Sequence, residues 1–96
     1  MNPTYVLDLD GLEFYDDQRN LLVGEVPGTT QEYTFSGDGK VVTRVDHKKG
    51  ATVVRSDAYT YGDTTITEVR TMSGVGTLTI VTNTETLATS VTFAAA

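Results

Sequence analysis

The chain has 96 residues, of which 39% are hydrophobic and 21% charged, with a formal net charge of -6. This balance is typical of one globular domain over residues 1–96 and excludes a disordered tail, a collagen-like fibre and, without cysteine, a disulfide scaffold. The excess of acids argues against nucleic acid as a partner, because such binding needs clustered Lys and Arg. The apolar runs are too short to span a bilayer, so we expect no membrane insertion.

Two β-branched residue types dominate the composition, with 18 Thr and 12 Val. Such side chains are stiff about χ1 and fit a pleated sheet better than a helix. No part of the sequence keeps a helical period of 3.6 residues over a sustained window. The composition therefore predicts an all-β fold with little helix.

The first thirty residues are the least regular part of the chain. Residues 5–9 and 12–15 have strand-like composition and are separated by Asp10 and Gly11, which favour a turn. A further strand is predicted over 21–26, ended by Pro27 and Gly28. A short helical turn between residues 16 and 22 is the alternative for this part.

From residue 31 onward, short segments alternate between apolar and polar side chains and are separated by turn residues. This pattern predicts strands at 31–35, 40–46, 51–56, 57–61, 64–70, 77–82 and 86–93. The intervening turns are too short for a crossover, so neighbouring strands should pair in antiparallel hairpins. We therefore expect a small antiparallel up-and-down barrel of about eight strands.

The larger apolar side chains of these strands share one parity and should face a common interior. They are Tyr33, Phe35, Tyr59, Tyr61, Ile66, Leu78, Ile80, Leu87, Val91 and Phe93. A filled core is the simplest role for them. A small barrel can also hold one ligand at its mouth, and for that role we select Tyr33, Phe35, Tyr59, Tyr61 and Phe93. The buried phenols need partners: they lie near the mouth, pair internally or face a polar ligand.

Three further groups of residues carry side chains that could take part in chemistry. Asp8-Leu9-Asp10-Gly11 is similar to the first motif of the haloacid-dehalogenase phosphatases, but that family needs a parallel α/β sheet, so a strand ending in a turn is preferred. Asp8, Asp10 and Glu13, with Asp16 and Asp17, could offer oxygen ligands to calcium but lack the EF-hand spacing. His47, the sole histidine, is predicted to be a solvated residue at a hairpin tip. We therefore expect no enzyme activity, no cofactor and no metal.

Residues 31–93 resemble the short lipocalin-like domains of secreted Bacteroidetes proteins. Glu32-Tyr33-Thr34-Phe35 leading into Asp38-Gly39 is similar to that family's Y-x-F strand and D-G turn, and Tyr59-Thr60-Tyr61 is similar to its Y-x-Y segment. Residues 77–87 are similar to its closing strands, whereas the family's N-terminal G-x-W segment is absent. The resemblance implies a calycin-type antiparallel barrel on an exported or lipid-anchored protein, and it implies no catalytic residues.

Two functions follow as expectations. The first is a non-enzymatic, extracytoplasmic binding module, periplasmic or on the cell surface, that holds a small apolar or amphipathic ligand at the barrel mouth. The second is a structural or protein-interaction domain with a filled core, which would recruit a protein partner through a loop or an exposed edge strand. The polar outer faces, with Thr77, Thr79, Thr86 and Thr92, suit the second.

Overall fold

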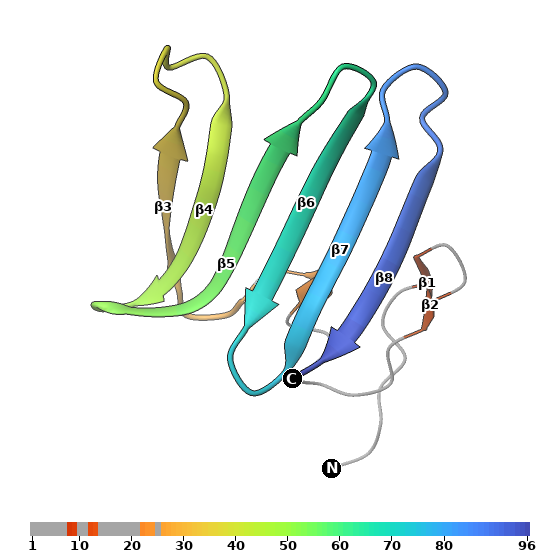
Figure 1. Ribbon diagram of the computed structural model, residues 1–96. Coiled ribbons are helices and arrows are strands. Elements are labelled where there is room, and N and C mark those ends of the chain that lie inside the picture. The colour runs from red at the N-terminus through yellow and green to blue at the C-terminus, as the bar shows by residue number, and fades with distance from the viewer. Residues whose placement is uncertain (1–7, 10–11, 14–21, 25) are drawn as a thin grey trace.

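The computed structural model describes residues 8–9, 12–13, 22–24 and 26–96 (Figure 1). Two short strands, β1 (Asp8–Leu9) and β2 (Leu12–Glu13), pair with each other in a sheet of their own. Six longer strands form the main sheet: β3 (Thr30–Phe35), β4 (Val42–Lys49), β5 (Thr52–Tyr61), β6 (Thr65–Met72), β7 (Gly76–Asn83) and β8 (Thr89–Ala95). The predicted all-β class is confirmed.

The main sheet is an open antiparallel meander. Its strands lie in chain order from β3 to β8, so every neighbour along the chain is a neighbour in space. Among the described strands β3 pairs only with β4 and β8 only with β7, which leaves two edges. The prediction of hairpins is confirmed, whereas the described strands do not close into a barrel of eight. Six strands form the main sheet, and β1 and β2 pair only with each other and not with any of those six.

Cross-strand pairing divides the side chains between two faces, because directly opposed residues point to the same side. One face carries the rows Gln31–His47–Arg55–Met72–Gly76, Tyr33–Val45–Asp57–Arg70–Leu78–Phe93, Tyr59–Glu68–Ile80–Val91 and Tyr61–Ile66–Thr82. We call it the covered face. The other, the threonine face, carries Thr34, Thr60, Thr67, Thr71, Thr77, Thr79 and Thr92. Three of the four outward threonines predicted lie there, while Thr86 lies in the β7–β8 turn.

The covered face takes its name from residues 22–24 and Val26, which lie across one end of it (Figure 1). Leu22 and Val26 are buried against Met72 and Leu78, and Val91 and Phe93 pack around this small core. The strand predicted at 21–26 is wrong, because Leu22 and Val23 have helical backbone and Val26 lies outside any strand. The helical turn predicted as its alternative falls mostly outside the described residues.

The β7–β8 connection is longer than the sequence predicted. β8 begins at Thr89 rather than at residue 86, and Leu87 lies in the turn with a φ of 63°. Asn83 holds this turn, since its Oδ1 accepts hydrogen bonds from the backbone N–H groups of Glu85 and Thr86. Leu87 is 75% exposed, so its assignment to the apolar interior is wrong.

Candidate functional site

Three of the five predicted ligand-binding residues, Tyr33, Tyr59 and Tyr61, lie in rows of the covered face. A fourth, Phe35, follows Tyr33 on β3 at a shift in the β3–β4 register, where it pairs with Val42. Tyr33 and Phe35 lie two residues apart on β3, and Tyr59 and Tyr61 lie two apart on β5. We call these four side chains the aromatic shelf. Tyr33, Phe35 and Tyr61 are 51%, 57% and 43% exposed, so the shelf presents ring surface to solvent. The predicted common face is therefore confirmed for Tyr33, Tyr59 and Tyr61, but a dry interior around them is not.

The tyrosine hydroxyls of the shelf pair internally, which was one of the three arrangements left open. Tyr61 Oη donates to the carbonyl of Val42 at 2.7 Å, and Tyr59 Oη donates to Glu68 Oε2 at 3.2 Å. Tyr33 Oη donates to Gln31 Oε1 at 2.6 Å. The polar tips are thus occupied within the chain, and the rings remain as the available surface.

The fifth predicted residue, Phe93, lies elsewhere on the same face. It belongs to the row of Leu78, packs against the core that Leu22 and Val26 form with Met72 and Leu78, and is half-buried. Its ring lies within about 3 Å of the position that a Cβ on Gly76 would take. The structure therefore places Phe93 in the packed core and not beside the shelf.

A buried polar cluster lies next to that core and was not predicted. Arg55 binds Asp57 through two parallel hydrogen bonds, Nε to Oδ1 at 2.9 Å and Nη2 to Oδ2 at 3.0 Å. His47 Nε2 lies 2.9 Å from Asp57 Oδ2, and all three residues are almost fully buried. Bidentate pairing of this kind offsets much of the cost of burying both charges.

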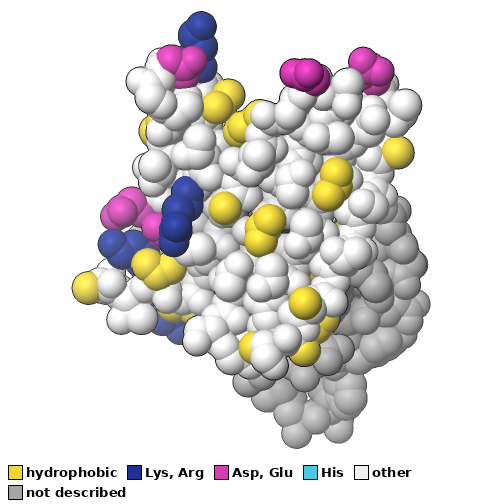
Figure 2. Space-filling view, viewed as in Figure 1, with side chains coloured by type: hydrophobic (Ala, Val, Ile, Leu, Met, Phe, Trp, Pro, Cys, Tyr) yellow, Lys and Arg dark blue, Asp and Glu magenta, His cyan; other side chains and the backbone are white. Residues whose placement is uncertain are grey.

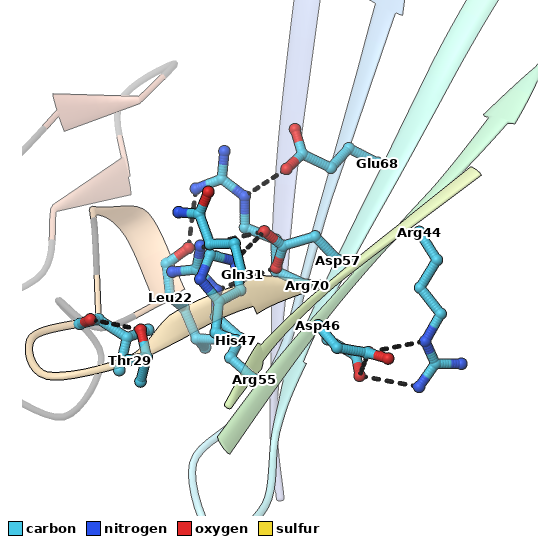
Figure 3. Close-up of polar contacts among 12 residues, drawn as sticks. Leu22, Thr29, Gln31, Arg44, Asp46, His47, Arg55, Asp57, Glu68 and Arg70 are labelled. Atoms are coloured by element: carbon cyan, nitrogen blue, oxygen red, sulfur yellow. Dashed lines mark hydrogen bonds and ion pairs between the residues drawn. The ribbon is translucent and has the colours of Figure 1, made fainter. Parts of the chain in front are cut away.

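The prediction that His47 is a solvated turn residue is wrong, because it lies within β4 and faces the core (Figure 3). Its Nε2 also lies 3.1 Å from Arg55 Nη2, but Nε2 cannot donate to Asp57 and accept from Arg55 at once. We assign the proton to Nε2, because the carboxylate then receives a charge-assisted hydrogen bond. This tautomer leaves the buried Nδ1 as an acceptor with no hydrogen-bond partner.

Two arginines fix residues 22–24 to the sheet. Arg70 Nη1 donates to the carbonyls of Leu22 and Val23 at 2.9 and 2.7 Å, and its Nε binds Glu68 at 2.7 Å (Figure 3). Arg55 Nη1 donates to the carbonyl of Gly24 at 2.6 Å. The two arginines thus supply donors to the backbone carbonyls of residues 22–24, which gives both guanidinium groups a structural role.

The geometry of the cluster gives no support to a serine triad on His47. Asp57 contacts both Arg55 and His47 Nε2, and the other ring nitrogen of His47, Nδ1, has no hydrogen-bond partner. The Ser56 hydroxyl donates to Asp46 and the Ser36 hydroxyl to Asp38, so neither serves His47. A triad needs a nucleophile in hydrogen-bond reach of the base.

The threonine face holds a smaller ionic group at the surface. Asp46 accepts hydrogen bonds from Arg44 Nε at 2.8 Å and from the Ser56 hydroxyl at 2.7 Å. The Arg44 contact, followed by the Ser56 contact, lowers the pKa of Asp46 below its usual value. Figure 2 shows this face, where hydrophobic side chains form isolated patches among polar atoms.

Two shallow cavities of the described residues open on the threonine face. One of about 370 Å³ lies over β4–β6 beside Arg44, Val54, Ala58 and Val69. The other, of about 290 Å³, lies over β6–β8 beside Val81, Asn83 and Ser90. Neither of these two cavities is lined by the aromatic shelf or by Phe93.

The acidic residues of the N-terminal part can be placed only in part. Asp8 and Glu13 are direct partners in the β1–β2 ladder, which is antiparallel, while Asp10, Asp16 and Asp17 lie outside the described residues. Within the described ranges, no group of three or more His, Asp or Glu side chains is placed to hold a metal ion. No helix in the described part is long and apolar enough to cross a membrane.

Comparison with known proteins finds no similar protein from which a function for this site could be inferred. The chain matches no protein-family model, no curated protein and no solved structure. Any functional conclusion must therefore come from the residues themselves.

Proposed function

We propose that the chain is a non-enzymatic binding module that holds a small apolar or amphipathic ligand against the aromatic shelf. The observation that carries the proposal is the exposed aromatic surface of Tyr33 and Phe35 on β3 and of Tyr61 on β5, the two strands that flank β4. Exposed aromatic surface gathered on one face is a common mark of a binding site. Because the three phenols already have partners, the shelf offers a ligand mainly ring faces, which suits an apolar body.

The proposal includes the wider context that the lipocalin-like resemblance implies. In that context the meander from β3 to β8 is the wall of a calycin-type barrel, and the protein works outside the cytoplasm. The up-and-down order of the six strands supports this relation, since such barrels are built from sequential hairpins. Closure would require further strands between β3 and β8.

A titration with a solvatochromic dye tests the ligand site, supported by native mass spectrometry of gently purified protein. Replacing Tyr33 and Phe35 together by serine should weaken dye binding by about tenfold, because each aromatic contact contributes about 0.5–1.5 kcal/mol. Leu87→Ser is the control, since it removes an apolar side chain outside the shelf that is even more exposed than Tyr33 and Phe35. Equal dye affinity in the wild type, the double variant and the control would refute the proposal.

A second candidate function is a protein-interaction domain, and the state of β3 favours it. All six residues of this edge strand are exposed, and the shelf residues Tyr33 and Phe35 belong to it. An exposed edge can add a strand from another chain through main-chain hydrogen bonds.

A further inference from the structure

The free edge of β3 presents a defined set of backbone groups. In an antiparallel ladder, alternate residues direct both N–H and C=O toward one neighbour, and the residues between direct theirs away. Ser36 N–H donates to the carbonyl of Val41, and the Thr34 carbonyl accepts from Thr43 Oγ1. The even-numbered residues therefore face β4, and Gln31, Tyr33 and Phe35 direct their N–H and C=O groups outward. Figure 1 shows β3 as an edge of the sheet.

This outward set is complementary to itself. When a second β3 is laid antiparallel with a two-fold axis at Tyr33, Tyr33 faces Tyr33 of the second copy, and Gln31 faces Phe35 of the second copy. All three outward residues are then matched, which allows up to six inter-chain hydrogen bonds by the geometry of antiparallel pairs. Centring the axis on Glu32 or Thr34 instead would leave one outward residue facing beyond the strand.

Charge supports the same register. Glu32, the one charged residue of β3, then lies opposite Thr34 of the second copy, so no like charges meet across the new ladder. An axis at Glu32 would place the two Glu32 carboxylates directly opposite each other. On the covered face, the Tyr33 rings of the two copies become direct neighbours, and cross-strand aromatic pairs stabilise sheets.

We propose that the β3 edge binds the β3 edge of a second copy, antiparallel, with the two-fold axis at Tyr33. The proposal rests on the second candidate function and names its partner. It would join the two sheets into one and bring the two aromatic shelves side by side. The net charge of -6 on each copy opposes association, so dimerisation should strengthen as salt screens this repulsion.

Single cysteines can locate the axis, because the chain has none of its own. With the axis at Tyr33, the Cα atoms of the two residues 33 lie about 5.5 Å apart, within disulfide range. The corresponding distances for Glu32 and Thr34 are about 8 Å, beyond that range. Under mild oxidation Tyr33→Cys should therefore give a disulfide-linked dimer, whereas Glu32→Cys and Thr34→Cys should remain monomers. Preferential crosslinking of either flanking variant would overturn the proposed register.

Analytical ultracentrifugation at low and high salt tests the association without any cysteine. The wild type should shift from 10.4 kDa toward twice that mass as concentration and salt rise. Tyr33→Pro removes an outward N–H that β4 does not use, so the variant should fold and stay at 10.4 kDa. Tyr33→Thr keeps the N–H and should still associate. A wild type that stays monomeric in all conditions overturns the proposal, while dye binding by that monomer would leave the ligand site intact.

Discussion

At the scale of single residues, the pKa of the half-buried Tyr59 phenol depends on its surroundings. Burial raises the pKa of its phenol from 10.0 to about 12, and the nearby Glu68 carboxylate acts in the same direction. The hydroxyl donates to that carboxylate, so the protonated phenol is the form that fits the folded chain. Loss of the proton would place two negative charges side by side.

This arrangement predicts a loss of stability at alkaline pH. The unfolded chain releases the Tyr59 proton near pH 10 and the folded chain only near pH 12, so the stabilisation is complete below pH 10 and is lost across that window. Tyr59→Phe keeps the ring and should lose the corresponding slope. Urea unfolding followed by circular dichroism between pH 9 and pH 12 measures it, and parallel slopes for the two proteins would contradict the assignment.

Residue-level patterns also explain what the sequence could and could not predict. The Thr and Val alternation predicted the strands from residue 31 onward and placed the shelf tyrosines on one face. It does not predict the buried cluster, because the neighbouring Lys48, Lys49 and Gly50 indicate a hairpin tip at His47. A usable signal was present: Arg55 with Asp57 and Glu68 with Arg70 are opposite charges two residues apart, which puts each pair on one face of its strand.

At the scale of elements, the pairing of β7 with β8 depends on one glycine. Gly76 has a φ of 144°, and a Cβ placed there would lie 2.3 Å from the Ala94 carbonyl oxygen and 3.0 Å from the Phe93 ring. The backbone oxygen cannot move away without displacing β8. Gly74, in the preceding turn, also has a positive φ, of 79°, but a Cβ there would meet nothing within 4 Å.

These two glycines form a matched pair for mutation. Gly76→Ala should lower the free energy of unfolding by roughly 2–4 kcal/mol, because strain in the backbone adds to overpacking against β8. Gly74→Ala should cost about 1 kcal/mol, the penalty of a left-handed conformation alone. Urea denaturation of both variants measures the difference, and equal costs would show that β8 yields to the added methyl group.

The sequence predicted the pairing of neighbouring strands but not that the sheet stays open. Short turns predicted hairpins correctly, because loop length alone decides that neighbours pair antiparallel. Closure into a barrel depends instead on whether the first and last strands meet, and no local pattern encodes that contact. The strand predicted at 21–26 failed for a related reason, since its apolar residues serve to cover the sheet: Leu22 and Val26 pack onto Met72 and Leu78.

At the scale of the whole molecule, the two faces of the sheet differ in how much apolar surface must be covered. The threonine face is polar enough to remain in water, whereas on the covered face Leu22 and Val26 bury Met72 and Leu78. Hydrophobic contact alone does not hold this segment in one place, because its carbonyls would be left without donors. Arg70 supplies donors to Leu22 and Val23 and is itself held by Glu68.

Removing this arginine should therefore detach the cover as well as break an ion pair. Arg70→Met should lower the free energy of unfolding by about 2–4 kcal/mol, since it leaves the mostly buried Glu68 carboxylate and two carbonyls without the guanidinium. The double variant Glu68→Gln/Arg70→Met removes the carboxylate charge and should recover part of that loss. Hydrogen exchange separates the two effects: amide protection in β6 and β7 under the cover should fall in both variants, while protection in the β3–β4 ladder should follow global stability alone. Unchanged protection beneath the cover would show that packing of Leu22, and not the arginine, holds the segment on the sheet.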